Sequence, residues 1–134
     1  MKSLFVLSVF LFSALTLNNN DKIKIEGLKK SYNQNQNIEF TINNNSEKKY
    51  YYISIEYYDN RWIELINDIS QPESRVSVIN LINPHQIVKK NISIKKVFYL
   101  KNFLMFKKFR LKIVYGKSSD EINTTYFSNS FEII

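Results

Sequence analysis

The chain has 134 residues and a formal net charge of +7, and it contains no cysteine, one histidine and two glycines. The lack of cysteine excludes disulfides, a lipid-modified cysteine and every thiolate metal site, and two glycines are too few for a Gly-rich phosphate loop. Ten phenylalanines and nine tyrosines can supply much of one hydrophobic core.

The first segment, Met1–Leu17, has a short basic start at Lys2 followed by an almost wholly apolar run. The run is shorter than the roughly 20 apolar residues of a membrane-spanning helix, and its pattern is that of a secretory signal peptide. The small-x-small pattern of a cleavage site is poor at Ala14-Leu15-Thr16, so an uncleaved anchor is the alternative. Residues 18–134, about 117 in all, are enough for one domain. This domain is expected in the periplasm, at the cell surface or outside the cell.

Alternation of apolar and polar residues predicts the strands of the first half. The segment Asp21–Lys30 is a first strand with Gly27 at a bulge or bend, and Ser31–Gln36 is a polar turn. Two stronger strands follow within Asn37–Tyr58, joined by the polar loop Asn43–Lys49. The residues expected to face the core in this pair are Ile38, Phe40, Ile42, Tyr51, Ile53, Ile55 and Tyr57.

The second half continues the pattern of short strands separated by turns. After a turn at Asp59-Asn60, we expect strands at 61–66, 75–82, 87–96, 109–115 and 126–134, the last with Phe127, Phe131 and Ile133 on one side. The segment Val97–Phe106 fits either a helical turn or the end of a strand. Seven or eight short strands without a long amphipathic helix predict an all-β, antiparallel sandwich.

Short motifs spread over Tyr32–Ile134 point to a known family. They are Tyr32 with Ile38–Asn43 and Asn45-Ser46, then Trp62-Ile63-Glu64, Asn83–Gln86, Lys107–Leu111 and Ser128–Ile133. Together they resemble the bacterial immunoglobulin-like domains of small secreted proteins. The chain departs from that pattern near Asn35, His85 and Lys107, where turn glycines are missing. The resemblance implies an immunoglobulin-like sandwich that acts as a structural or binding module, and it carries over no catalytic residue.

Residues that could support catalysis or metal binding are few. His85 is the only histidine and lies in a proline turn, so we expect a surface residue rather than a metal ligand. Carboxylates are clustered only around the aromatic region, and they are Glu56, Asp59, Glu64 and Asp68. We expect these residues to face outward from strands or to lie in turns. The alternative is that two of them form a paired-carboxylate glycosidase site. We therefore expect no enzyme, no cofactor and no metal site.

Two groups of residues are candidates for a binding surface. The first is an aromatic strip that would be exposed if the outer side of its strand is uncovered; its members are Tyr50, Tyr52, Tyr58 and Trp62. The second is the stretch from Arg75 to Ser119, which has no Asp or Glu and includes Lys95 and Lys96. Clustered cations attract anionic glycans, lipids or nucleic acid. For the aromatic strip, the alternative is that its rings pack over the edge of the sandwich. For the basic stretch, the alternative is that its lysines reflect compositional bias on a solvent-exposed face.

These observations favour an exported, non-enzymatic module that binds a protein or an anionic glycan of the cell envelope. One alternative is a small inhibitor or accessory subunit of an exported enzyme, with the loop Ile66–Arg75 entering a partner's cleft. A less favoured alternative is a glycan-active enzyme that uses Glu56 or Glu64. No nucleic acid partner is expected, and membrane contact is expected only if Met1–Leu17 stays uncleaved.

Overall fold

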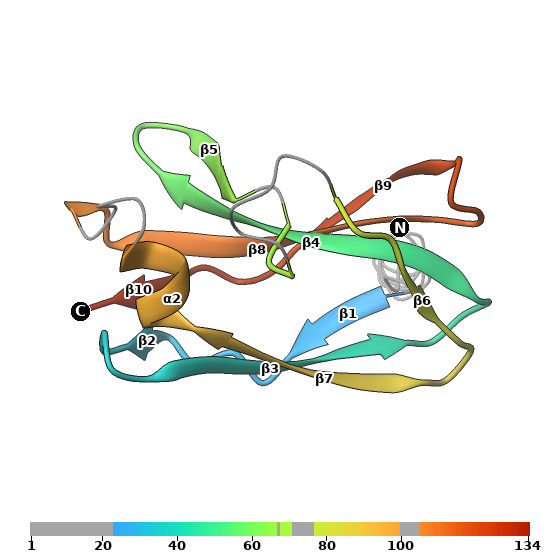
Figure 1. Cartoon of the computed structure of the whole chain (residues 1–134), viewed down its shortest axis with the longest axis horizontal. Coiled ribbons are helices and arrows are strands. Elements are labelled where there is room, and N and C mark those ends of the chain that lie inside the picture. The colour runs from blue at the N-terminus through green and yellow to red at the C-terminus, as the bar shows by residue number, and fades with distance from the viewer. Residues whose placement is uncertain (1–22, 67, 71–76, 100–104) are drawn as a thin grey trace, which may run out of the picture.

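The computed structural model describes residues 23–66, 68–70, 77–99 and 105–134 (Figure 1). The predicted signal segment Met1–Leu17 lies outside these residues, as does most of the predicted loop Ile66–Arg75. In chain order the elements are β1 (Ile23–Glu26), β2 (Ser31–Tyr32), β3 (Asn37–Asn44), β4 (Lys49–Tyr58), β5 (Trp62–Ile66), β6 (Asn80–Ile82), β7 (Ile87–Ser93), α2 (Ile94–Tyr99), β8 (Lys108–Gly116), β9 (Ile122–Phe127) and β10 (Phe131–Ile133).

The strands form two sheets that face each other across the core (Figure 1). The three-stranded sheet has the order β1-β3-β7, and the seven-stranded sheet has the order β2-β10-β8-β4-β5, with β6 beside β4 and β9 beside β8. Every pair is antiparallel except β10 with β2, which is parallel. The predicted all-β sandwich is therefore confirmed.

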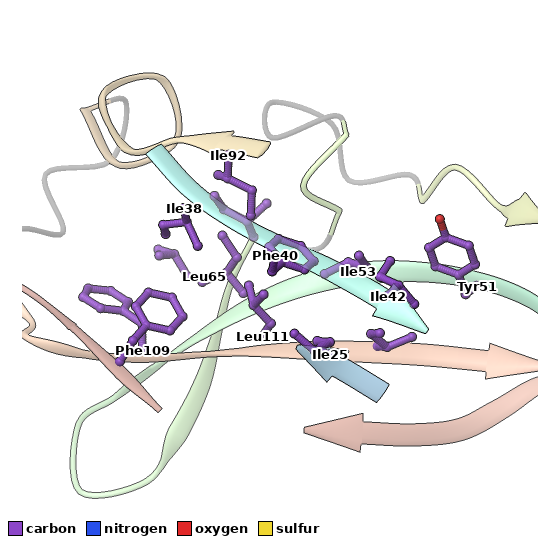
Figure 2. Close-up of a cluster of buried hydrophobic side chains, with 14 of the residues drawn as sticks. Ile25, Ile38, Phe40, Ile42, Tyr51, Ile53, Leu65, Ile92, Phe109 and Leu111 are labelled. Atoms are coloured by element: carbon purple, nitrogen blue, oxygen red, sulfur yellow. The ribbon is translucent and has the colours of Figure 1, made fainter. Parts of the chain in front are cut away.

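Inward-facing side chains of both sheets meet in one core (Figure 2). Alternation along β3 and β4 places the expected residues there, because successive side chains of a strand point to opposite sides of the sheet. The buried members from β3, β4 and β8 are Ile38, Phe40, Ile42, Tyr51, Ile53, Ile55, Phe109, Leu111, Ile113 and Tyr115. Tyr57 is only half-buried, and its ring packs 4.3 Å from that of Phe106, centroid to centroid.

Several predicted boundaries are corrected by the structure. The described part of the chain has ten strands rather than seven or eight, partly because Ser31 and Tyr32 pair with β10 instead of lying in a turn. The loop after β3 is limited to 45–48. The expected strand at 87–96 ends at Ser93, and α2 begins at Ile94. The ambiguous segment Val97–Phe106 is helical as far as Tyr99, and residues 100–104 lie outside the described part.

The prediction that Phe127 faces the core was wrong, and a bulge at 128–130 is the reason. From Phe127 to Phe131 the chain advances four residues, while its partner strand advances three, from Lys112 to Phe109. The extra residue reverses the side to which the following side chains point. Phe131 is therefore buried, whereas Phe127 is 43% exposed on the outer face of the sheet.

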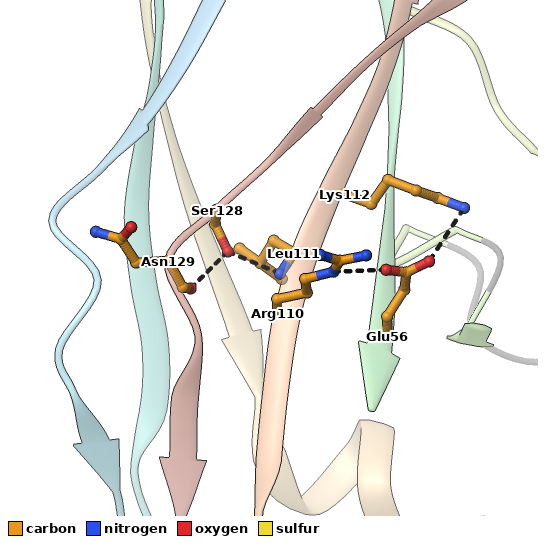
Figure 3. Close-up of polar contacts among 6 residues, drawn as sticks. All are labelled: Glu56, Arg110, Leu111, Lys112, Ser128 and Asn129. Atoms are coloured by element: carbon orange, nitrogen blue, oxygen red, sulfur yellow. Dashed lines mark hydrogen bonds and ion pairs between the residues drawn. The ribbon is translucent and has the colours of Figure 1, made fainter. Parts of the chain in front are cut away.

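Ser128 replaces the backbone pairing that the bulge interrupts (Figure 3). Its hydroxyl accepts a hydrogen bond from the Leu111 N–H at 2.8 Å and donates one to the Asn129 carbonyl at 2.8 Å. A buried N–H without a partner is costly, so this hydroxyl stabilises the bulge.

In the described residues no helix is long and apolar enough to cross a membrane.

Two turns at one end of the sandwich are joined by Asn44, whose side chain is fully buried. Its amide nitrogen donates to the Glu47 carbonyl at 2.9 Å and to the Asn83 carbonyl at 3.0 Å. The Asn44 carbonyl accepts from the His85 N–H at 2.8 Å. His85 has a φ of 59°, in the left-handed region that glycine usually occupies. As expected, His85 lies in an exposed turn.

Candidate functional site

The outer side of the seven-stranded sheet gathers aromatic and cationic residues from four neighbouring strands. Residues directly opposite each other on paired strands point to the same side. The register pairs Tyr58 with Trp62, Glu56 with Arg110, and Lys112 with Phe127. We call the following five residues the aromatic–cationic face: Tyr58, Trp62, Lys108, Arg110 and Phe127.

Arg110 is the centre of this face. Its Cζ lies 4.3 Å from the ring centroid of Trp62 and 3.7 Å from that of Phe127. Its Nε donates to Oε1 of Glu56 at 2.7 Å (Figure 3). A planar guanidinium can stack on aromatic rings and bind a carboxylate at the same time. Arg110 therefore holds the two rings in fixed positions across the width of the sheet.

Glu56 is shared between two cations, Arg110 and Lys112. Its second carboxylate oxygen lies 3.7 Å from Nζ of Lys112 (Figure 3), and the residue is only 8% exposed. Burial of a carboxylate is costly unless it is paired with a cation and hydrogen-bonded. The pairing explains why a glutamate tolerates burial on the outer side of β4.

Tyr58, Lys108 and Phe127 are the exposed members of the face, and the first two are in contact with each other. The ring centroids of Tyr58 and Trp62 are 5.3 Å apart at an interplanar angle of 63°, and Tyr58 is 43% exposed. Nζ of Lys108 lies 5.3 Å from the Tyr58 centroid and 5.9 Å from the Trp62 centroid. Within the described residues Lys108 has no carboxylate at ion-pair distance. Its charge is thus available beside an exposed ring.

The predicted aromatic strip is divided by the structure. Tyr58 and Trp62 are in contact, but six residues of strand, roughly 20 Å, separate Tyr58 from Tyr52. Tyr50 lies beyond it, with Nζ of Lys48 at 5.7 Å from its ring centroid. Both Tyr50 and Tyr52 are half-buried.

Tyr52 has a local environment of its own. Burial raises the pKa of its hydroxyl, and the carboxylates of Glu64 and Asp68 raise it further. The phenol ring is therefore held against the sheet near negative charge, whereas Tyr58 lies near positive charge. Tyr52 and Tyr58 therefore differ in their electrostatic surroundings.

The basic stretch predicted from the sequence is spread over different elements. Lys95 and Lys96 are exposed in α2, Lys89 is exposed on β7 of the three-stranded sheet, and Lys108 lies on β8 of the other sheet. Lys95 and Lys96 therefore lie outside the strands that carry the aromatic–cationic face. The sequence stretch is not one continuous surface.

Three members of the face were not singled out from the sequence. Lys108 and Arg110 were counted only within the basic stretch, and Phe127 was assigned to the core. The available signal was the alternation of Lys108, Arg110 and Lys112 with buried residues along β8, which places all three cations on one side. The contacts of Lys108 and Arg110 with Trp62 depend on the pairing of β8 with β4 and of β4 with β5.

The four clustered carboxylates lie in different positions. Glu56 is bound to Arg110 and lies opposite Glu64 of β5, and Asp59 is exposed in the turn after β4. Asp68 is 1% exposed and accepts hydrogen bonds from the Ser70 N–H, the Ser70 hydroxyl and the Val78 N–H, so it fixes the chain after β5. Within the described ranges, no three His, Cys, Asp or Glu residues are grouped so that they could hold a metal ion.

Comparison with known proteins gives limited similarity. No known family and no curated protein matches the chain. Solved structures of a β-glucosidase from Listeria innocua match 83% of this chain at 15% identity, with TM-scores of 0.43 for the complex with gluconolactone and 0.42 for the complex with isofagomine. The chain covers only 15% and 16% of those two chains. Similarity at this level says nothing about activity or ligand.

Proposed function

We propose that the protein is an exported, non-enzymatic immunoglobulin-like module that binds a protein or glycan at the bacterial cell envelope. The observation that carries this proposal is the aromatic–cationic face, where Arg110 fixes two rings and leaves Phe127 43% exposed. Exposed apolar side chains that adjoin one another on a protein surface are a common feature of binding sites.

The composition of the face supports binding. Trp, Tyr and Arg are the residues enriched in the energetically important parts of protein interfaces, and aromatic rings also offer flat apolar surfaces to sugars. Side chains that are already held in place lose little conformational freedom when a partner binds. Contact between Trp62, Tyr58 and Arg110 provides such order before any partner arrives.

Export is supported by the apolar segment after Lys2, and the resemblance to immunoglobulin-like domains of small secreted bacterial proteins supports the same location. Fractionation of tagged full-length protein, with mass spectrometry of its N-terminus, tests this. A mature chain that begins near Asn18 in an exported soluble fraction is expected. An intact Met1 in the membrane fraction would instead indicate an uncleaved anchor, and a cytoplasmic location would contradict export.

Binding can be tested by co-sedimentation of the purified domain with isolated cell envelopes of the source bacterium. Trp62→Ala should weaken binding by about tenfold or more, because it removes a central ring. Ile87→Ala is the matched control, since Ile87 is 61% exposed on the three-stranded sheet. Equal envelope binding by the two variants, both folded by circular dichroism, would contradict the proposal.

A stable complex with an exported enzyme, recovered by pull-down, would favour the accessory-subunit alternative. The loop Ile66–Arg75 that would enter such a partner lies largely outside the described residues.

A further inference from the structure

A groove of about 760 Å³ extends the aromatic–cationic face toward the edge formed by β2. Its lining includes Lys29, Lys30, Ser31, Lys108, Ser130 and Glu132. Three of these residues are lysines and one is a glutamate, so the groove carries an excess of positive charge. It lies beside the bulge at 128–130, which also contributes to its lining.

The strand register joins this groove to the aromatic rings. Glu132 is paired with Ser31 on one side and with Lys108 on the other. Lys108 in turn has its Nζ 5.3 Å from the centroid of Tyr58, which contacts Trp62. A single row across the sheet therefore runs from a lysine-rich groove to an exposed aromatic pair, with Lys108 belonging to both.

Three kinds of binding group lie along this row. Lysine ammonium groups attract anions, and within the described residues Lys108 forms no ion pair, although Glu132 lies opposite it on β10. The exposed Ser31 and Ser130 can donate and accept hydrogen bonds. The exposed Tyr58 ring provides an apolar surface. A chain of acidic sugars offers the complement of all three: carboxylate or sulfate groups, hydroxyls, and the apolar faces of sugar rings.

We infer that the groove and the Tyr58–Trp62 pair bind one acidic polysaccharide chain. This inference rests on the proposed binding function and names the chemistry of the partner. Acidic groups of the sugar lie at Lys29, Lys30 and Lys108, and a neighbouring sugar ring lies against Tyr58. Single-stranded nucleic acid fits less well, because successive bases stack on ring faces, whereas Tyr58 and Trp62 meet edge to face at 63°.

The test uses isothermal titration calorimetry of the purified domain with polygalacturonate and with neutral dextran. Polygalacturonate should bind and dextran should not, and higher salt should weaken the binding. The double variant K29E/K30E should weaken binding by about tenfold or more, as should Tyr58→Ala. The matched control is K89E/K95E, which makes the same change in net charge at residues outside the groove and should alter affinity less than about twofold.

Three results would overturn the inference. One is an equal loss of affinity in K29E/K30E and K89E/K95E, which would mean that net charge alone attracts the polymer. Another is tighter binding of oligothymidine or polyglutamate than of polygalacturonate at matched charge. The third is no binding of polygalacturonate at all.

Envelope co-sedimentation separates failure of this inference from failure of the binding function. If envelope binding depends on Trp62 but K29E/K30E leaves it unchanged, the binding module stands and the acidic-sugar site is wrong. If neither change affects envelope binding, both proposals fail.

Discussion

The outer sides of the two sheets differ in composition although both belong to one short chain. On the three-stranded sheet the outward positions of β1, β3 and β7 carry no aromatic ring, and a hollow there contains Glu26 and Glu39 as well as Lys89. On the seven-stranded sheet five rings face outward; they are Tyr50, Tyr52, Tyr58, Trp62 and Phe127. A general bias toward aromatic residues would affect both sides alike. The difference therefore favours a specific role for the seven-stranded sheet.

The inner sides of the sheets, in contrast, should be equivalent. Phe40→Ala in the three-stranded sheet and Ile55→Ala in the seven-stranded sheet should each lower the free energy of unfolding by about 2–5 kcal/mol, because both side chains are buried and each change leaves a cavity. Chemical denaturation measures this. A cost below about 0.5 kcal/mol at either position would show that the side chain is not in the core.

The outer sides should respond differently to loss of one cation. Arg110→Ala should lower the free energy of unfolding by about 1–3 kcal/mol, because Glu56 loses its closest partner while remaining poorly hydrated. Lys89→Ala on the other sheet is the control and should change it by less than about 0.5 kcal/mol, as is usual for an exposed residue. Similar values for the two variants in the same denaturation assay would remove the contrast between the sheets.

The bulge that turns Phe127 outward can be tested separately. Ser128→Ala should lower the free energy of unfolding by about 1–2 kcal/mol, because the buried Leu111 N–H loses its hydrogen-bond acceptor. Hydrogen exchange should also accelerate at the Leu111 amide. If that amide stays as protected as in the original protein, another group must satisfy it.

The smallest effect concerns the other half of the outer face and appears only at high pH. Tyr52 has its pKa raised above the ordinary 10.0, first by burial and then by Glu64 and Asp68. Below about pH 10 both the folded and the unfolded chain keep the Tyr52 hydroxyl proton. In that range Tyr52 therefore contributes no pH dependence to the free energy of unfolding. Above it the unfolded chain loses the proton first, and stability falls until the pH passes the folded pKa.

Tyr52→Phe should therefore lose less stability than the original protein between about pH 8 and pH 10.5. Denaturation at the two pH values measures the difference. An identical loss in both proteins would mean that Tyr52 ionises equally in the folded and unfolded chains.

The core could be predicted from the sequence because it depends on local alternation. Residues such as Phe40, Ile55 and Leu111 occupy every second position of their strands and are buried as that pattern requires. Phe127 was misassigned because alternation cannot show an extra residue in a strand, and the bulge becomes visible only when its partner strand is known.

The candidate site could be predicted only in part. Tyr58 and Trp62 are near neighbours in sequence across a tight turn, so their contact could be predicted from the sequence. Arg110 is separated from Glu56 by 54 residues, and their ion pair depends on the register between β4 and β8. The groove near Lys29 and Lys108 depends in addition on the parallel pairing of β2 with β10.

That parallel pairing has a mechanical consequence. Strand β2 lies near the start of the domain and β10 at the end of the chain, and they run in the same direction. Their contact includes hydrogen bonds from the Glu132 N–H to the Lys30 carbonyl and from the Ile134 N–H to the Tyr32 carbonyl, at 2.9 and 2.8 Å. A pull applied between the start of β2 and the end of β10 acts along these parallel strands, so it loads both bonds together in shear rather than opening them one after the other. The pairing of β2 with β10 therefore resists separation of these two strands along their length.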